Sequence, residues 1–238
     1  MSNIKGENIF VTNLFINWLN LNNLCELKYL QKIFPNLSIF TFEIWNDKNS
    51  NYGCILNIEE NSKCKVTEFS IIIKTFQNIK FYCSPYETLT KVDFGLYCKI
   101  KNIKDIFPIF QDKSKVEFKS LIHFSFSSVD IESDIDIITN IYNNLETMPK
   151  LKYFKLYSVG MDIDIDEEFH TKFIIKLLKM KIEYINFEIV KTSSGKDRPG
   201  IYSKKELEKI YPNLGPYNPK KIQIRKIQKI YKIYPKRK

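Results

Sequence analysis

The hydrophobic pattern of the chain repeats about every thirty residues. A six-residue unit, apolar-x-x-apolar-x-apolar, occurs at six places whose first residues lie 29, 23, 32, 30 and 31 positions apart. Because its last two apolar positions alternate with other residues, each unit predicts a strand with one buried face. We call this unit the hexad, and its six copies begin at Leu37, Val66, Leu89, Leu121, Leu151 and Ile182. A seventh would begin at Leu214, where Gly215, Pro216 and Pro219 cut it short.

Segments with helical periodicity precede several of these hexads. Each ends in a short turn, usually at a proline, one or two residues before the next hexad. The spacing of Ser203 and Glu206 adds a capping box at the start of one segment. The segments between residues 46 and 61 and between 76 and 86 indicate strand and loop instead. We therefore expect four helices, within residues 26–34, 133–148, 167–180 and 203–211.

A strand and a helix of this size cannot each bury an apolar face alone. Stacked copies of such a unit bury a continuous core between a parallel sheet and a row of helices. The sequence therefore predicts an α/β solenoid that is irregular in its middle, where the 23-residue interval is too short for a long helix. We expect an N-terminal capping segment at 1–36, the repeats at 37–214 and a basic tail at 215–238.

The hexad with its following turn and helix resembles the leucine-rich-repeat family in its longer-repeat form, over residues 24–214. In that family an α-helix covers the convex side, and Asn or Cys three residues after the hexad binds loop backbone. This chain departs from the consensus at that position, which holds Trp45, Lys74, Tyr97, Val129, Val159 and Val190. The resemblance implies a divergent leucine-rich-repeat solenoid whose exposed sheet face binds another protein.

The residues between the apolar positions of each hexad should form that exposed face. Around the last two hexads they include tyrosines, which supply contact area at low entropic cost. Strand tyrosines are also common without any binding role. The candidate partner-binding residues are Lys152, Tyr153, Lys155, Tyr157, Tyr184 and Asn186. We expect a non-enzymatic protein-interaction module.

The formal charge of +10 is concentrated at the carboxy terminus. Nine basic residues and no acidic one follow Pro219, so the rest of the chain is nearly neutral. As a helix, this tail would place Ile224 and Ile227 opposite Lys221 and Arg225. The alternative function is therefore binding of nucleic acid or an anionic surface through the tail. Capping of the solenoid end and a merely solvated tail are further interpretations. The candidate tail residues are Lys220, Lys221, Arg225, Lys226, Lys229 and Lys232.

Little in the sequence points to catalysis or to a metal. The two histidines, His123 and His170, lie far apart and have no nucleophile motif beside them. Alternating aspartates end at Asp166 ahead of a predicted helix, where carboxylates favour the helix dipole. They lack the glycine and glutamate spacing of a calcium loop. We expect no catalytic residue, no metal site and no cofactor, with an enzyme as the third alternative.

Composition gives the cellular setting. Five cysteines without a C-x-x-C pair suggest reduced thiols, and no apolar run is long enough to span a membrane. The chain holds 34 lysines and 36 isoleucines against 3 arginines and no alanine. This bias resembles proteins of AT-rich genomes, such as those of amoebae and their large DNA viruses. We expect a monomer in the cytoplasm, with the nucleus as the alternative.

Overall fold

The structure is a computed structural model. The described residues are 10–19, 25–27, 33–45, 53–57, 65–73, 78–82, 88–97, 108–110, 117–129, 134–160, 165–191, 200–212, 221–224 and 226. Among these residues, no helix is both long and apolar enough to cross a membrane.

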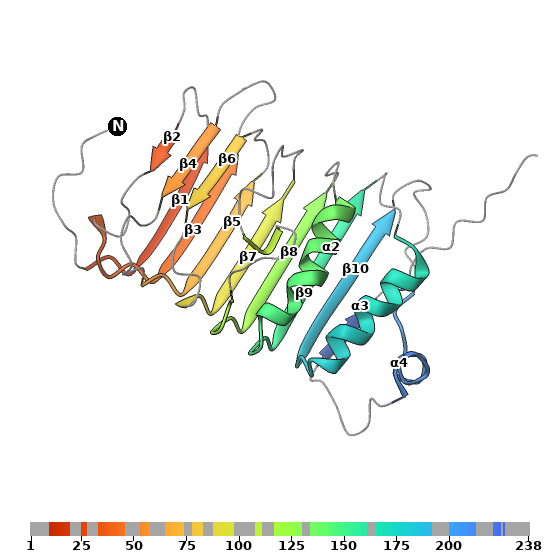
Figure 1. The fold of residues 1–238 in the computed structure, drawn as a ribbon. Helices are drawn as coiled ribbons and strands as arrows, with labels where there is room; N and C mark the ends of the chain where they lie inside the picture. The colour runs from red at the N-terminus through yellow and green to blue at the C-terminus, as the bar shows by residue number, and fades with distance from the viewer. Residues whose placement is uncertain are drawn as a thin grey trace, which may run out of the picture.

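Eight strands form one open sheet in which every neighbouring pair is parallel (Figure 1). The strand order follows the chain, apart from three strands that belong to a second sheet. The fold is therefore α/β with an open parallel sheet. In sheet order the strands are β1 (Asn13–Leu19), β3 (Ile39–Trp45), β5 (Glu68–Ile73), β7 (Lys91–Leu96), β8 (His123–Val129), β9 (Tyr153–Gly160), β10 (Tyr184–Lys191) and β11 (Lys221–Ile224).

The hexads pair in register across this sheet, as the sequence predicts. Phe124 of β8 lies beside Phe154 of β9, which lies beside Ile185 of β10. The register is the same at the next apolar position, and these side chains are buried. Since one register runs through all six hexads, their apolar positions form continuous buried rows along the sheet.

Helices cover the buried face of the carboxy-terminal half (Figure 1). Helix α2 (Asp134–Asn144), continued by the 3₁₀ turn η4 (Leu145–Thr147), precedes β9, and α3 (Glu167–Lys179) precedes β10. In the segment before β8, the described residues form a 3₁₀ turn, η3 (Pro108–Phe110). The Phe110 ring lies between Phe94 and Phe126, at 4.9 and 5.4 Å. Helix α4 (Lys204–Ile210) follows β10.

The amino-terminal repeats carry strands where the later repeats carry helices. The strands β2 (Cys25–Leu27), β4 (Gly53–Asn57) and β6 (Asn78–Tyr82) form a second parallel sheet of three strands. In Figure 1 this sheet stands in front of β1, β3 and β5. The prediction of strand between 46 and 61 and between 76 and 86 is confirmed. The helix predicted at 26–34 is wrong at its start, because residues 25–27 are a strand.

The main sheet extends past the predicted repeats at both ends. Strand β1 pairs with β3 so that Leu14 and Ile16 continue the two buried rows. At the other end, β11 starts at Lys221, five residues later than the period predicts, because a hexad beginning at Leu214 would start its strand at position 216. Its pairing with β10 corrects the helical reading of the tail, because residues 221–224 are extended and Ile224 is buried in the core.

Hydroxyl groups link neighbouring strands of the main sheet where the amino-terminal strands begin. Ser38 donates to the carbonyl of Thr12, Thr67 to that of Ser38, and Thr90 to that of Thr67, at 3.2, 3.3 and 3.0 Å. The same carbonyls also accept backbone N–H groups of the following rung. This ladder satisfies the backbone carbonyls at the starts of the amino-terminal strands.

Candidate partner-binding face

The outward face of the main sheet carries the residues that the sequence selects. Along β9, Tyr153, Lys155 and Tyr157 alternate with Phe154 and Leu156, which are fully buried in the core. A strand places successive side chains on opposite faces, so the first three residues share the outward side. On β10, Tyr184 pairs with Tyr153 and Asn186 with Lys155. The structure therefore brings these five candidate residues together on two adjacent strands.

An aromatic row crosses three neighbouring strands of this face. The ring of His123 stacks on that of Tyr153 at 3.9 Å between centroids and 8° between planes. The ring of Tyr153 lies 6.0 Å from that of Tyr184. The hexad pattern places His123 on the outward side of its strand, but it is not among the predicted partner-binding residues. The register of the hexads could have identified it, because His123, Tyr153 and Tyr184 all stand two residues after the first hexad position.

Burial and nearby lysines lower the pKa of His123 below its ordinary value of 6.5. Burial contributes most and Lys91 next, while Asp93 and Glu68 act in the opposite direction and Lys155 adds to the lowering. His123 is therefore neutral at pH 7 and offers a nitrogen that can accept a hydrogen bond.

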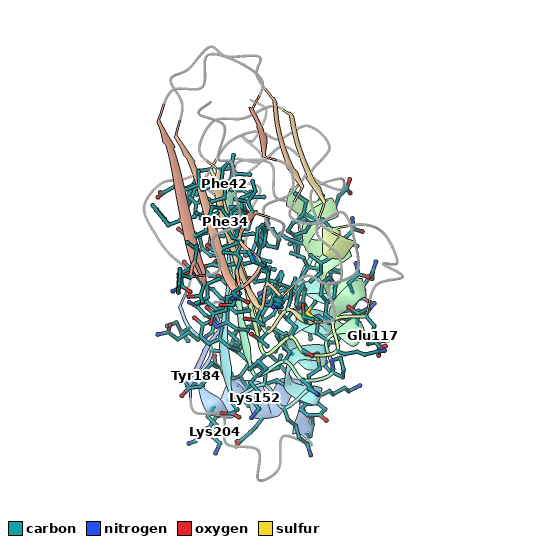
Figure 2. All side chains as sticks on the ribbon, turned by 90° about the vertical axis from the view of Figure 1, so that its left-hand side faces the viewer. Phe34, Phe42, Glu117, Lys152, Tyr184 and Lys204 are labelled. Carbon is teal, nitrogen blue, oxygen red and sulfur yellow. The ribbon has the colours of Figure 1, made fainter. Side chains whose placement is uncertain are left out.

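Two ion pairs border the aromatic row. Lys152 and Glu183, which precede β9 and β10, approach to 3.3 Å. Lys91 of β7 and Glu68 of β5 also approach to 3.3 Å. Lys152 thus lies beside the tyrosines as predicted, but Glu183 partly neutralises its charge. In Figure 2, Lys152 and Tyr184 lie close together at the lower end of the molecule.

A polar row lies beside the aromatic row, two residues further along each strand. Ser125, Lys155 and Asn186 follow one another in register on β8, β9 and β10. Ser125 is only 2% exposed, so its larger neighbours cover it, although the sequence places it on a solvated face. Neither Lys155 nor Asn186 makes a side-chain hydrogen bond or ion pair with any residue that the structure describes. Both groups are available to a partner.

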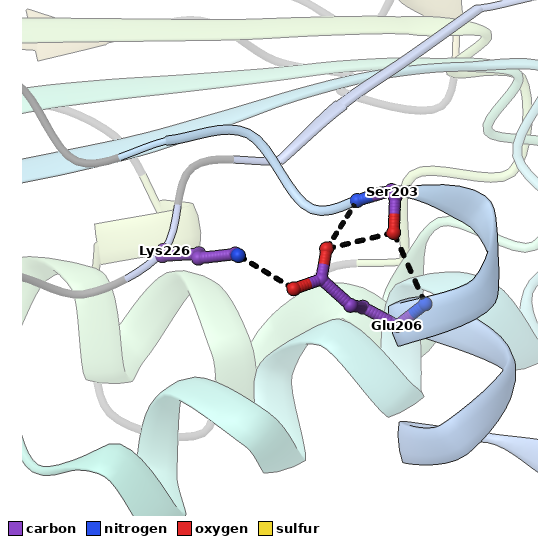
Figure 3. Close-up of polar contacts among 3 residues, drawn as sticks. All are labelled: Ser203, Glu206 and Lys226. Carbon is purple, nitrogen blue, oxygen red and sulfur yellow. Dashed lines mark hydrogen bonds and ion pairs between the residues drawn. The ribbon is translucent and has the colours of Figure 1, made fainter.

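The predicted tail residues split between the sheet and segments outside the described residues. Lys221 begins β11, and Lys226 pairs with Glu206 of α4 at 2.5 Å (Figure 3). The other candidates, Lys220, Arg225, Lys229 and Lys232, lie outside the described residues. Lys226 therefore links the end of the sheet to α4, which is a structural role.

The partner of Lys226 is part of the predicted capping box. Ser203 accepts a hydrogen bond from the backbone N–H of Glu206, and the Glu206 carboxylate accepts one from the backbone N–H of Ser203 (Figure 3). The hydrogen bond from Lys226, followed by those from Ser203, lowers the pKa of Glu206 from 4.5 to about 2.

Acid should weaken the attachment of α4. The pKa of Glu206 is lower in the folded chain than in the unfolded chain, so its stabilising contribution is complete above pH 4.5 and is lost as the pH falls towards about 2. We expect Glu206→Gln to lower the melting temperature at pH 7 and to have a smaller effect at pH 2.5. Thermal unfolding of both proteins at the two pH values tests this. An equal difference at both pH values would contradict it.

The remaining chemical candidates serve the fold. Asp166 caps α3 by accepting a hydrogen bond from the Phe169 N–H at 2.6 Å, which confirms the helix-start interpretation for this aspartate. His170 is buried against the rings of Phe187 and Tyr202. Within the described residues there is no group of three His, Cys, Asp or Glu side chains that could hold a metal ion.

Comparisons with known proteins identified no related protein. No family model matches the chain, and the searches of curated proteins and of solved structures also gave no match.

Proposed function

We propose that the chain is a protein-interaction module that binds its partner with the outward face of β8, β9 and β10. The observation that supports this most is the aromatic row of His123, Tyr153 and Tyr184, with Lys155 and Asn186 beside it. Large amphipathic side chains on a rigid sheet lose little entropy on binding, and they dominate the energetics of many interfaces.

The orientation of the rings favours a protein over single-stranded nucleic acid. Nucleic-acid platforms offer open ring faces on which bases stack. Here the face of Tyr153 is covered by His123. The hydroxyl groups of Tyr153 and Tyr184 suit hydrogen bonds to peptide groups and carboxylates.

The proposal covers the fold family and the cellular role as well. The strand register and the helices over the carboxy-terminal half support a divergent leucine-rich-repeat protein. We further propose that it acts without enzymatic activity, as a monomer, in the cytoplasm or nucleus. Nucleic-acid binding through the basic tail is the second proposal, and only composition supports it. The pairing of Lys226 with Glu206 removes one charge from that role.

A triple substitution tests the proposed face. We expect Tyr153→Ala, Tyr157→Ala and Tyr184→Ala together to reduce retention of partner proteins by the immobilised full chain more than tenfold, because a tyrosine at the centre of an interface can cost about 2 kcal/mol when it is truncated. Quantitative mass spectrometry of proteins captured from an extract of the source cells measures retention. Circular dichroism should show that the variant is folded at the assay temperature.

The control is Tyr97→Ala, which removes an exposed tyrosine that follows β7. It should retain partners at the level of the unaltered chain. Unchanged retention by the folded triple variant would exclude this face. Removal of residues 227–238 separates the tail proposal, because retention that depends on the tail should be lost and should also fall steeply with salt.

A further inference from the structure

A second feature borders the aromatic row at the end of the sheet where β8, β9 and β10 begin. This end is called the edge below. The turns that enter β9 and β10 carry Lys150 and Lys181, each directly before the first hexad position. Because Tyr153 and Tyr184 are paired in register, these two lysines occupy equivalent positions of successive turns. Lys179 lies at the end of α3, just before the second turn. All three lysines are exposed.

The carboxylates on the turns around these lysines are already paired. Glu117 approaches Lys119 at 3.6 Å and Glu183 approaches Lys152 at 3.3 Å. Glu146 approaches Lys176 of α3 at 3.1 Å. By contrast, Lys150, Lys179 and Lys181 make no ion pair with any described residue. This edge therefore has an excess of positive charge that the described part of the chain does not neutralise.

Exposed apolar surface continues from the aromatic row to this edge. Ile122, which precedes β8, is 43% exposed, and Tyr184 is 36% exposed. The backbone N–H groups of Lys152 and Tyr153 both bond to the carbonyl of Ile122, which places Ile122 next to the start of β9. Apolar surface and unpaired cations are thus neighbours at the starts of β8, β9 and β10.

We propose that this edge binds an acidic protein segment, with carboxylates on Lys150 and Lys181 and apolar side chains on Ile122, Tyr153 and Tyr184. The inference rests on the proposed function and adds the chemistry of the partner. Charge complementarity selects an acidic segment, and the covered ring face of Tyr153 disfavours stacked bases as the source of the negative charge. The lysines speed up association, and the apolar contacts prolong the complex.

The conformation of Lys181 provides a variant that removes charge without harming the fold. Its φ of 55° lies in the left-handed region, directly after the last residue of the α3 cap. Asparagine adopts this conformation more readily than lysine. Lys181→Asn should therefore keep or raise the melting temperature. Combined with Lys150→Gln, it removes two charges from the edge.

The matched control removes two charges from helices elsewhere. Lys172 of α3 pairs with Glu168 of the same helix, and Lys209 lies in the last turn of α4. Lys172→Gln with Lys209→Gln gives the same net charge as the edge variant. Any effect of overall charge, including attraction of anions to the basic tail, is therefore the same in both proteins.

The probe is a fluorescent twelve-residue peptide of alternating glutamate and leucine, measured by anisotropy with the full-length chains. We expect the edge variant to bind it about fivefold more weakly than the unaltered chain, because each exposed ion pair contributes modestly. The control variant should bind within twofold of the unaltered chain. Equal affinities of the edge and control variants would overturn the proposal.

An oligothymidylate with the same number of charges distinguishes the two sources of negative charge. Its affinity should be equal for the edge and control variants, because the tail attracts it in both. An equal fivefold loss on this oligonucleotide would overturn the choice of a protein partner in favour of nucleic acid. If the edge test fails while the tyrosine variant still loses its partners, the proposed function stands and only the acidic-segment inference is wrong.

Discussion

Phe173→Ala is expected to lower the free energy of unfolding by about 3–5 kcal/mol, the range for removing a buried phenylalanine. Phe173 of α3 is fully buried and is the centre of the aromatic core between helices and sheet. Its ring lies 4.8 Å from that of Phe187, 5.3 Å from that of Tyr142 and 5.9 Å from that of Phe154. These rings belong to β10, α2 and β9, so the cavity would loosen two repeats at once.

Equilibrium unfolding in urea measures this loss, and the adjacent Lys172→Ala is the control. Lys172 is exposed on the same helix, so its replacement should change stability by no more than about 0.5 kcal/mol. A loss below about 1 kcal/mol for Phe173→Ala would show that α3 does not pack on β9 and β10 as described.

The second large effect is expected from two asparagines that attach α2 to η3. Asn140 and Asn144 are buried, and they donate to the carbonyls of Phe110 and Ile109 at 2.8 and 2.9 Å. Alanine at both positions removes the donors from two carbonyls in the interior, each at a cost of about 1–3 kcal/mol. We expect a combined loss of about 2–6 kcal/mol and faster amide hydrogen exchange at Phe110.

The matched control is Asn143→Ala, on the same helix between the two buried asparagines. Its side chain is exposed, so we expect a change within about 0.5 kcal/mol. Similar stability losses for the double variant and for Asn143→Ala would contradict the two buried hydrogen bonds. Helix propensity alone would then explain the loss of stability.

The strands were predictable because the hexad is a local signal repeated in a fixed register. Each copy places two apolar residues on the buried side of a strand, and the stacking of copies brings equivalent positions together. The helices at 133–148, 167–180 and 203–211 were also predicted close to their bounds, because they combine helical periodicity with caps such as Asp166 and Ser203.

The secondary-structure predictions are wrong where a short apolar segment fits both the helical and the strand periodicity. The pattern of residues 26–34 fits a helix as well as a strand, and the pairing of β2 (Cys25–Leu27) with β4 is a long-range contact that local pattern does not reveal. The tail has the same ambiguity, since Ile222 and Ile224 fit a strand while Ile224 and Ile227 fit a helix. Pairing with β10 decides in favour of the strand for residues 221–224.

The candidate face was predicted in part. Alternation along β9 and β10 was enough to select Tyr153, Lys155 and Tyr184. The stacking of His123 on Tyr153 depends on the register between strands, and the unpaired state of Lys150 and Lys181 depends on which carboxylates other lysines engage. The shared hexad position of His123, Tyr153 and Tyr184 is visible in the sequence, but the ring stacking and the unpaired lysines are tertiary properties that the sequence does not reveal.

The central claim is that the hexads stack as adjacent parallel rungs, and distances along one outward row test it directly. Spin labels on a chain with its five cysteines replaced by serine would pair residue Thr41 with Lys155, Asn186 or Gln223 in turn. The sheet order separates these pairs by four, five and six strand spacings. Double electron–electron resonance should give backbone separations near 19, 24 and 29 Å, rising by about 5 Å per strand. Distances that do not rise in this order would contradict the stacked sheet and the binding face built on it.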